Sequence, residues 1–258
     1  MSQPLAPFRQ LPILKAFGHM FSGIAAHWRP ALKLALPWML LTTVLNIWSF
    51  KTHPPSTNPL ADFNLNWTDW LIVAASLIAS SSLAVSWHRF ILIDAPLRDV
   101  PVFRMDRLVW LYLGRILAIF LLCMVPLVAL LVVGNMVARL LEPVIFALFL
   151  QLTIFGYRMS ISLPALAIGE TKIGIREALE LTRRNNLRIF GLIALTYLVL
   201  IIVFLGFVVV IGTLQSMQPN IALLGSFLLG IPVLFFHMLL TTNLLTSLYG
   251  FFVQKRDF

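Results

Sequence analysis

Five side chains that can bind an anion lie near the same ends of long apolar stretches. Counting about 1.5 Å per helical residue from the far end of each stretch places them in one third of a bilayer. They are His88, Arg89, Arg115, Arg158 and His237. Guanidinium groups match phosphate oxygens, and basic pockets between helices bind anionic headgroups, so these residues form a candidate headgroup or phosphate site. The simpler interpretation is that they only anchor helix ends at the membrane surface.

Three further residues are candidates for structural ion pairs: Glu170, Glu177 and Arg183. The two carboxylates can pair with Arg158 or Arg183 and thereby fix a surface helix against the bundle. None of the ten Asp and Glu residues falls inside an apolar stretch. Because proton-coupled pumps usually need a carboxylate at membrane depth, proton-driven antiport is disfavoured.

The sequence lacks the motifs of familiar catalytic and metal sites, including glycine-rich phosphate loops, HExxH and GxSxG. Haem held between helices needs two facing histidines, and only His237 lies well inside an apolar stretch. The single cysteine, Cys123, excludes disulfides and cysteine-based metal sites. We therefore expect no enzymatic activity, no metal and no cofactor.

The elements that must position these side chains are helices that cross a membrane. Six apolar stretches are each long enough for a span, at about residues 34–50, 70–90, 109–133, 143–159, 189–211 and 221–243. Amphipathic segments at 11–28 and 174–185 predict two interfacial helices, the second with Gly174 as N-cap and Glu177 three residues later. We expect one all-α integral membrane domain over residues 1–258, built as three helical hairpins.

The second span has an unusual composition, because small residues surround its middle between Ala74 and Ala84. Small side chains let helices approach closely in lipid, where packing and hydrogen bonds drive association. This span is therefore predicted to be the one most enclosed by the others. Prolines at positions 37, 126 and 232 are expected to bend the first, third and sixth spans.

The distribution of positive charge predicts the orientation. Seventeen of the nineteen Lys and Arg residues fall in alternate gaps between apolar stretches, and the exceptions are Lys51 and Arg139. Short loops rich in these residues stay in the cytoplasm during insertion, so both termini are predicted to be cytoplasmic. The net charge of +9 then suits anionic lipids of the cytoplasmic leaflet, and we expect no binding to nucleic acid. A content of 60% hydrophobic residues exceeds the roughly 45–50% of soluble proteins.

Several short motifs resemble those of a known group of proteins. Trp87-His88-Arg89-Phe90-Ile91-Leu92 fits WHR[FY]xL, and Ser162 to Glu170 is followed by Glu177-Ala178 and Thr182-Arg183-Arg184-Asn185. The chain thus resembles six-helix inner-membrane proteins of proteobacteria, related to the membrane domain fused to some glycerophosphodiester phosphodiesterases. The resemblance implies a bacterial inner-membrane location. The chain has no space for the catalytic hydrolase domain, so that activity does not carry over.

Three functions are compatible with these features. The favoured one is a non-enzymatic accessory or scaffold that binds anionic lipid headgroups or a partner membrane protein. The second is a small transporter or channel for an uncharged or anionic solute, with a polar cavity that reaches Asn135, Gln151 or the Ser80–Ser82 cluster. The third is a membrane-embedded lipid-modifying enzyme, which would need protonatable groups converging in a cleft.

Overall fold

A computed structural model describes residues 9–52, 66–96, 101, 103–137, 142–217 and 219–258. Its elements, in chain order, are α1 (Ile13–Ala26), α2 (Trp28–Thr52), α3 (Trp67–Ile93), α4 (Arg107–Val137), α5 (Glu142–Ser160), α6 (Ser162–Ala167), α7 (Ile175–Leu181), α8 (Asn186–Met217) and α9 (Pro219–Phe252). Within these ranges six helices are long and apolar enough to cross a membrane. The predicted all-α, multi-pass architecture is therefore confirmed.

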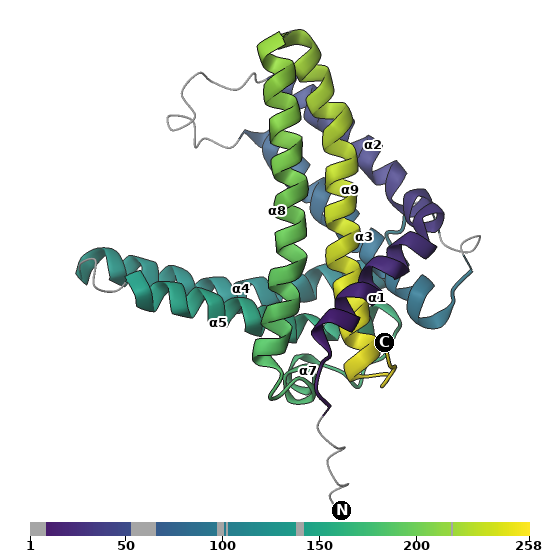
Figure 1. Cartoon of the computed structure of the whole chain (residues 1–258), viewed down its shortest axis with the longest axis vertical. Helices are drawn as coiled ribbons and strands as arrows, with labels where there is room; N and C mark the ends of the chain where they lie inside the picture. Colours follow the sequence, from purple (N-terminus) through teal and green to yellow (C-terminus); the bar gives the residue numbers. More distant parts are fainter. Residues whose placement is uncertain (1–8, 53–65, 97–100, 102, 138–141, 218) are drawn as a thin grey trace, which may run out of the picture.

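The six long helices form three hairpins, because α2 packs on α3, α4 on α5, and α8 on α9. The hairpins diverge from a common end at which the described ends of the chain also lie (Figure 1). We call this end the basic platform; it comprises α1, α6, α7 and the adjoining ends of α3, α4, α5, α8 and α9. The position of both described ends on one side agrees with an even number of crossings.

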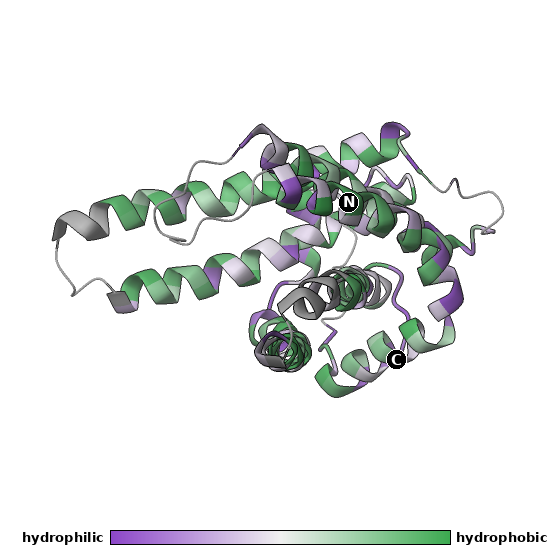
Figure 2. Cartoon of the chain, turned by 90° about the horizontal axis from the view of Figure 1, so that it is seen from above, coloured by the Kyte–Doolittle hydropathy of each residue, from purple (hydrophilic) through white to green (hydrophobic). Residues whose placement is uncertain are grey.

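The α4–α5 hairpin points away from the other two and is apolar along most of its length (Figures 1 and 2). Among the side chains that the structure describes in α4, the buried ones run only from Val109 to Cys123. The hairpin is therefore attached through its platform half, and its outer half presents apolar side chains such as Val128 and Phe146. At membrane depth such surfaces are solvated by lipid.

The enclosed position predicted for the second span is confirmed. In the most apolar 18-residue window of α3, 44% of the residues are buried, against 11–28% for the other five spans. The helix begins at a capping box in which the Asp69 carboxylate accepts the backbone N–H of Asn66 at 2.9 Å. Such a cap satisfies donors that have no partner in the first turn.

The surroundings of the fourth span and of the first amphipathic segment show features that the sequence did not predict. The fourth span is followed by a separate short helix, α6, with Pro164 in its first turn, where a missing N–H costs no helical hydrogen bond. The first amphipathic segment does form α1, but this helix packs on α8 and α9 with Ala16 and Met20 fully buried. The three expected prolines, Pro37, Pro126 and Pro232, all lie inside helices.

Candidate functional site

Arginine side chains of the basic platform turn onto backbone carbonyls near the ends of neighbouring helices. The last carbonyls of a helix have no intrahelical donor and carry its negative dipole end, so a guanidinium stabilises them. Four such contacts join Arg9 to Phe251 at 3.2 Å, Arg89 to Ala167 at 3.3 Å, Arg256 to Leu92 at 3.3 Å, and Arg158 to Leu179. Arg89 and Arg158, which the sequence predicted to bind phosphate, thus donate hydrogen bonds within the protein.

Arg158 is the clearest case, because only 7% of the residue is exposed. Its Nε donates to the Thr182 hydroxyl at 2.8 Å, and a second nitrogen donates to the Leu179 carbonyl. The Thr182 hydroxyl in turn donates to Ala178 within the same turn of chain. Arg158 therefore fixes α7 to the end of α5. Arg115 makes a similar contact, donating to the Ser162 carbonyl at 3.4 Å.

His88 is fully buried at a junction of the three hairpins. Its Nδ1 lies 2.9 Å from the Thr246 hydroxyl of α9, and its Nε2 lies 3.1 Å from the Tyr112 hydroxyl of α4. Since the Thr246 hydroxyl donates to the Thr242 carbonyl at 3.0 Å, we assign the imidazole proton to Nδ1. Tyr112 then donates to Nε2, so every group of the junction is satisfied. A headgroup at the surface does not reach this imidazole.

A second hydrogen-bonded link lies beside the junction. The Trp87 indole donates to the side-chain oxygen of Asn243 at 3.1 Å, and the Asn243 amide donates to the Met20 carbonyl at 2.6 Å. Asn243 thus joins α3, α9 and α1. The close approach of α1 is possible because Gly23 lies next to this amide, where an added Cβ would come within 3.1 Å of its nitrogen.

His237 lies elsewhere, about two and a half helical turns before Thr246 on α9. Its side chain is exposed on the surface of the bundle, where it lines an apolar cleft between α8 and α9. Of the five residues of the predicted headgroup site, Arg89, Arg115 and Arg158 each donate to a backbone carbonyl, His88 is bonded to two hydroxyl groups, and His237 faces the α8/α9 cleft. Hydropathy places them in one layer, but it does not determine which way each side chain turns.

The structure also corrects the expected ion pairs. Glu170 accepts the Tyr249 hydroxyl, and Glu177 accepts the backbone N–H of Gly174 at 2.9 Å, which caps α7. The ion pairs found between described residues are Arg9–Asp257, Arg104–Asp106 and Arg176–Glu180. Neither Glu170 nor Glu177 is joined to Arg158 or Arg183 in this set. Each carboxylate instead accepts a hydrogen bond from an uncharged donor.

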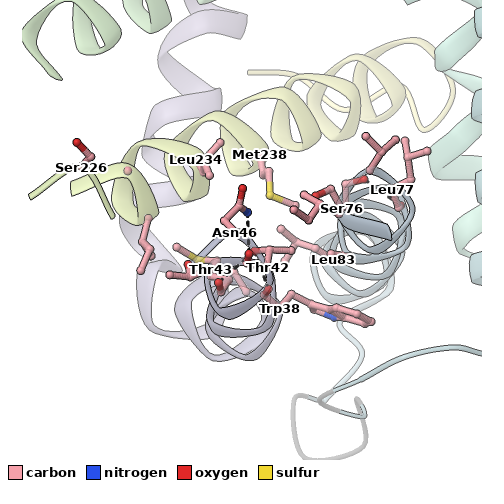
Figure 3. A pocket seen from close by; sticks show the side chains of 18 residues that line it. Trp38, Thr42, Thr43, Asn46, Ser76, Leu77, Leu83, Ser226, Leu234 and Met238 are labelled. Atoms are coloured by element: carbon pink, nitrogen blue, oxygen red, sulfur yellow. Dashed lines mark hydrogen bonds between the residues drawn. The ribbon is translucent and has the colours of Figure 1, made fainter. Parts of the chain in front are cut away.

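A further candidate site was not predicted from the charged residues. A cavity of about 560 Å³ lies between α2, α3 and α9, and we call it the α2/α3/α9 pocket (Figure 3). Its walls are mainly apolar, with Trp38, Leu83 and Met238 at the end nearer the basic platform. None of its described lining residues carries a charge. Six are uncharged and polar: Thr42, Thr43, Asn46, Ser76, Ser80 and Ser226.

The polar groups of the pocket differ in how far their own helices satisfy them. The Thr42 hydroxyl donates to the Trp38 carbonyl at 3.0 Å, and the Ser80 hydroxyl donates to Leu77. Asn46 points between α2 and α9, and its amide donates to the Thr42 carbonyl at 2.7 Å (Figure 3). Its side-chain oxygen accepts no hydrogen bond from any described residue. This oxygen is therefore available to a ligand.

The pocket is closed toward the basic platform. The Trp38 indole donates to the Ser82 hydroxyl at 3.2 Å, which joins α2 to α3 below the cavity. A cluster of buried side chains continues the closure: Ala31, Leu34, Ala35, Met39, Leu83, Trp87 and Leu239. The small residues of α3 gave a signal for this site in the sequence, since they leave room beside that helix. No comparable signal in the sequence predicted that α9 would also line this pocket.

The described residues contain no group of three or more His, Cys, Asp or Glu side chains placed to hold a metal ion. No family model, no curated protein and no solved structure matches the chain. The resemblance carried by the Trp87-His88-Arg89 motif accordingly stays a prediction. The site must be interpreted from its own geometry.

Proposed function

We propose that this multi-pass protein is a non-enzymatic accessory of the bacterial inner membrane that binds a lipid-like molecule with an uncharged polar group. The observation that carries the proposal is the α2/α3/α9 pocket, a cavity of about 560 Å³ formed by membrane-spanning helices. Binding pockets for small molecules have volumes of roughly 300–1,000 Å³ and combine apolar walls with a few polar groups. This pocket has both properties.

The chemistry of the lining supports an uncharged ligand. A charged group held at membrane depth needs a counter-charge, and none is present among the described lining residues. The free side-chain oxygen of Asn46 suits a donor such as a hydroxyl, while Ile72, Leu77 and Leu234 provide apolar contact for a chain. The described lining residues include no carboxylate, histidine, cysteine or lysine that could act in catalysis, so we favour binding as the function.

Exposed cations of α1 and of the first turns of α2 support an additional interaction with anionic lipids of the cytoplasmic leaflet. Lys15, Arg29 and Lys33 are exposed, and Arg29 lies over the Trp28 ring at 5.3 Å. Aromatic and basic side chains together favour the headgroup region. In this proposal the headgroup contacts belong to exposed cations of α1 and α2, and a partner membrane protein would meet the lipid-facing α4–α5 hairpin.

A second candidate function is movement of an uncharged solute through the same pocket. The observation that favours it is the closure at Trp38 and Ser82, which separates the cavity from the basic platform. Alternating access to a central site is how many transporters work. The mainly apolar lining favours a lipid-like ligand over a hydrophilic one.

The pocket can be filled at Gly230, where an added Cβ meets no atom within 4 Å. The experiment is mild-detergent purification of Gly230→Leu followed by mass spectrometry of the bound lipids. Wild-type protein is expected to retain an uncharged lipid or similar molecule, and Gly230→Leu to lose it because the leucine occupies the cavity.

The matched control is Gly206→Leu on α8, where an added Cβ also meets no atom within 4 Å. It changes the same residue type in a lipid-facing helix outside the pocket, and it should keep the ligand. Identical lipid content in all three proteins would reject the proposal, as would an equal loss in both variants.

A further inference from the structure

A second cleft lies between α8 and α9, with a volume of about 340 Å³. Its apolar walls include Phe204 and Val233, and its polar members are Tyr197 and His237. Leu234 borders both this cleft and the α2/α3/α9 pocket. The two cavities therefore lie against different sides of α9, and the second adds a site beyond the proposed function.

The His237 imidazole has no hydrogen-bond partner among the described residues. Its backbone carbonyl accepts the Thr241 hydroxyl at 2.9 Å, but no described group bonds the ring. An ionisable side chain inside a span is costly unless a partner satisfies it, and for this reason such residues commonly mark functional sites. A neutral imidazole offers one N–H donor to whatever occupies the cleft.

Tyr197 provides a second donor. Its hydroxyl lies 2.9 Å from the Tyr157 hydroxyl, and Tyr197 is 38% exposed where it lines the cleft. Two hydroxyl groups that share one hydrogen bond use only one of their two hydrogens. We assign Tyr157 as the donor of this pair, so the hydrogen of Tyr197 remains for an acceptor in the cleft.

The depth of both groups limits the class of ligand. His237 lies fifteen residues, or about 22 Å, before the end of α9 at Phe252. Tyr197 lies eleven residues, or about 16 Å, after the start of α8 at Asn186. Since α8 and α9 are each longer than a hydrocarbon core of about 30 Å, both groups lie toward its platform side, and the rest of the described lining of the cleft is apolar. An occupant at this depth must be uncharged and largely apolar.

We propose that the α8/α9 cleft binds an apolar molecule carrying a carbonyl oxygen, as in a quinone ring, with His237 and Tyr197 as hydrogen-bond donors. The apolar walls contact the ring and its chain, and the two donors orient the oxygen. This site does not depend on the α2/α3/α9 pocket.

The test measures binding of a radiolabelled decyl-substituted benzoquinone to protein in nanodiscs, with the signal of empty nanodiscs subtracted. Decylbenzene, which has a similar apolar body without oxygen, is the comparison probe. We expect His237→Leu and Tyr197→Phe each to weaken quinone binding about three- to tenfold, the effect of one hydrogen bond. Decylbenzene should bind weakly and equally to all variants.

Tyr157→Phe is the matched control, since it removes a hydroxyl from the same pair and leaves the Tyr197 hydroxyl in place. It should bind the quinone as wild type does. Gly230→Leu should also bind normally, which separates this site from the proposed function. Equal quinone binding by wild type, His237→Leu and Tyr197→Phe would overturn the inference, and so would equal binding of the two probes to wild type. If His237→Leu does not fold, Tyr197→Phe and the probe pair still decide.

Discussion

Replacing Tyr112 with phenylalanine tests whether the three hairpins are held together by the His88 junction. Tyr112 is 2% exposed and His88 is fully buried, so water does not replace the lost hydroxyl. The change leaves Nε2 of His88 without its donor at 3.1 Å. A buried group left unpaired costs about 1–3 kcal/mol, whereas hydrogen bonds between membrane helices average about 0.6 kcal/mol. We expect a loss of about 1–2 kcal/mol in the free energy of unfolding.

A double-mutant cycle isolates this contribution. In a His88→Phe background the Tyr112 hydroxyl has no imidazole to bond, so Tyr112→Phe should then change the free energy of unfolding by less than about 0.5 kcal/mol. The measurement is denaturant-induced unfolding of the purified protein in detergent, followed by tryptophan fluorescence.

Ser80→Ala serves as the control in α3, the helix that carries His88, since the Ser80 hydroxyl bonds the Leu77 carbonyl of its own turn at 3.0 Å. It should cost much less than Tyr112→Phe. Equal costs of Tyr112→Phe in the wild-type and His88→Phe backgrounds would refute the junction, because additive effects mean that the two side chains do not interact.

Two further predictions concern the basic platform. Arg158→Met removes the guanidinium that donates to the Leu179 carbonyl and the Thr182 hydroxyl. Amide hydrogen exchange over α7 should therefore become faster. Unchanged exchange would contradict the conclusion that Arg158 holds this helix in place. Partial burial, together with the nearby Arg256, lowers the pKa of His19 below its usual value of about 6.5. Because the unfolded chain then binds more protons, the free energy of unfolding should fall as the pH drops below about 6.5. His19→Gln should reduce this pH dependence, measured as melting temperature against pH. An unchanged slope would exclude His19 as its source.

The sequence alone determined the number and approximate limits of the spans. Hydropathy and helical period are local properties, so a continuous apolar stretch of sufficient length predicts a crossing wherever the remaining helices lie. The enclosed position of α3 was also predictable, because its small side chains permit close packing. The cap of α7 was predictable for the same kind of reason, since Gly174 and Glu177 are only three residues apart.

The tertiary structure decided what the polar side chains do. His88 meets a hydroxyl 158 positions away along the chain, and Trp87 meets an amide 156 positions away. Arg158 turns to a carbonyl of α7 because that helix end has acceptors without donors nearby. The α2/α3/α9 pocket likewise exists only where two hairpins meet. Hydrogen-bond partners and cavities depend on distant segments, and no local pattern encodes which segments come together.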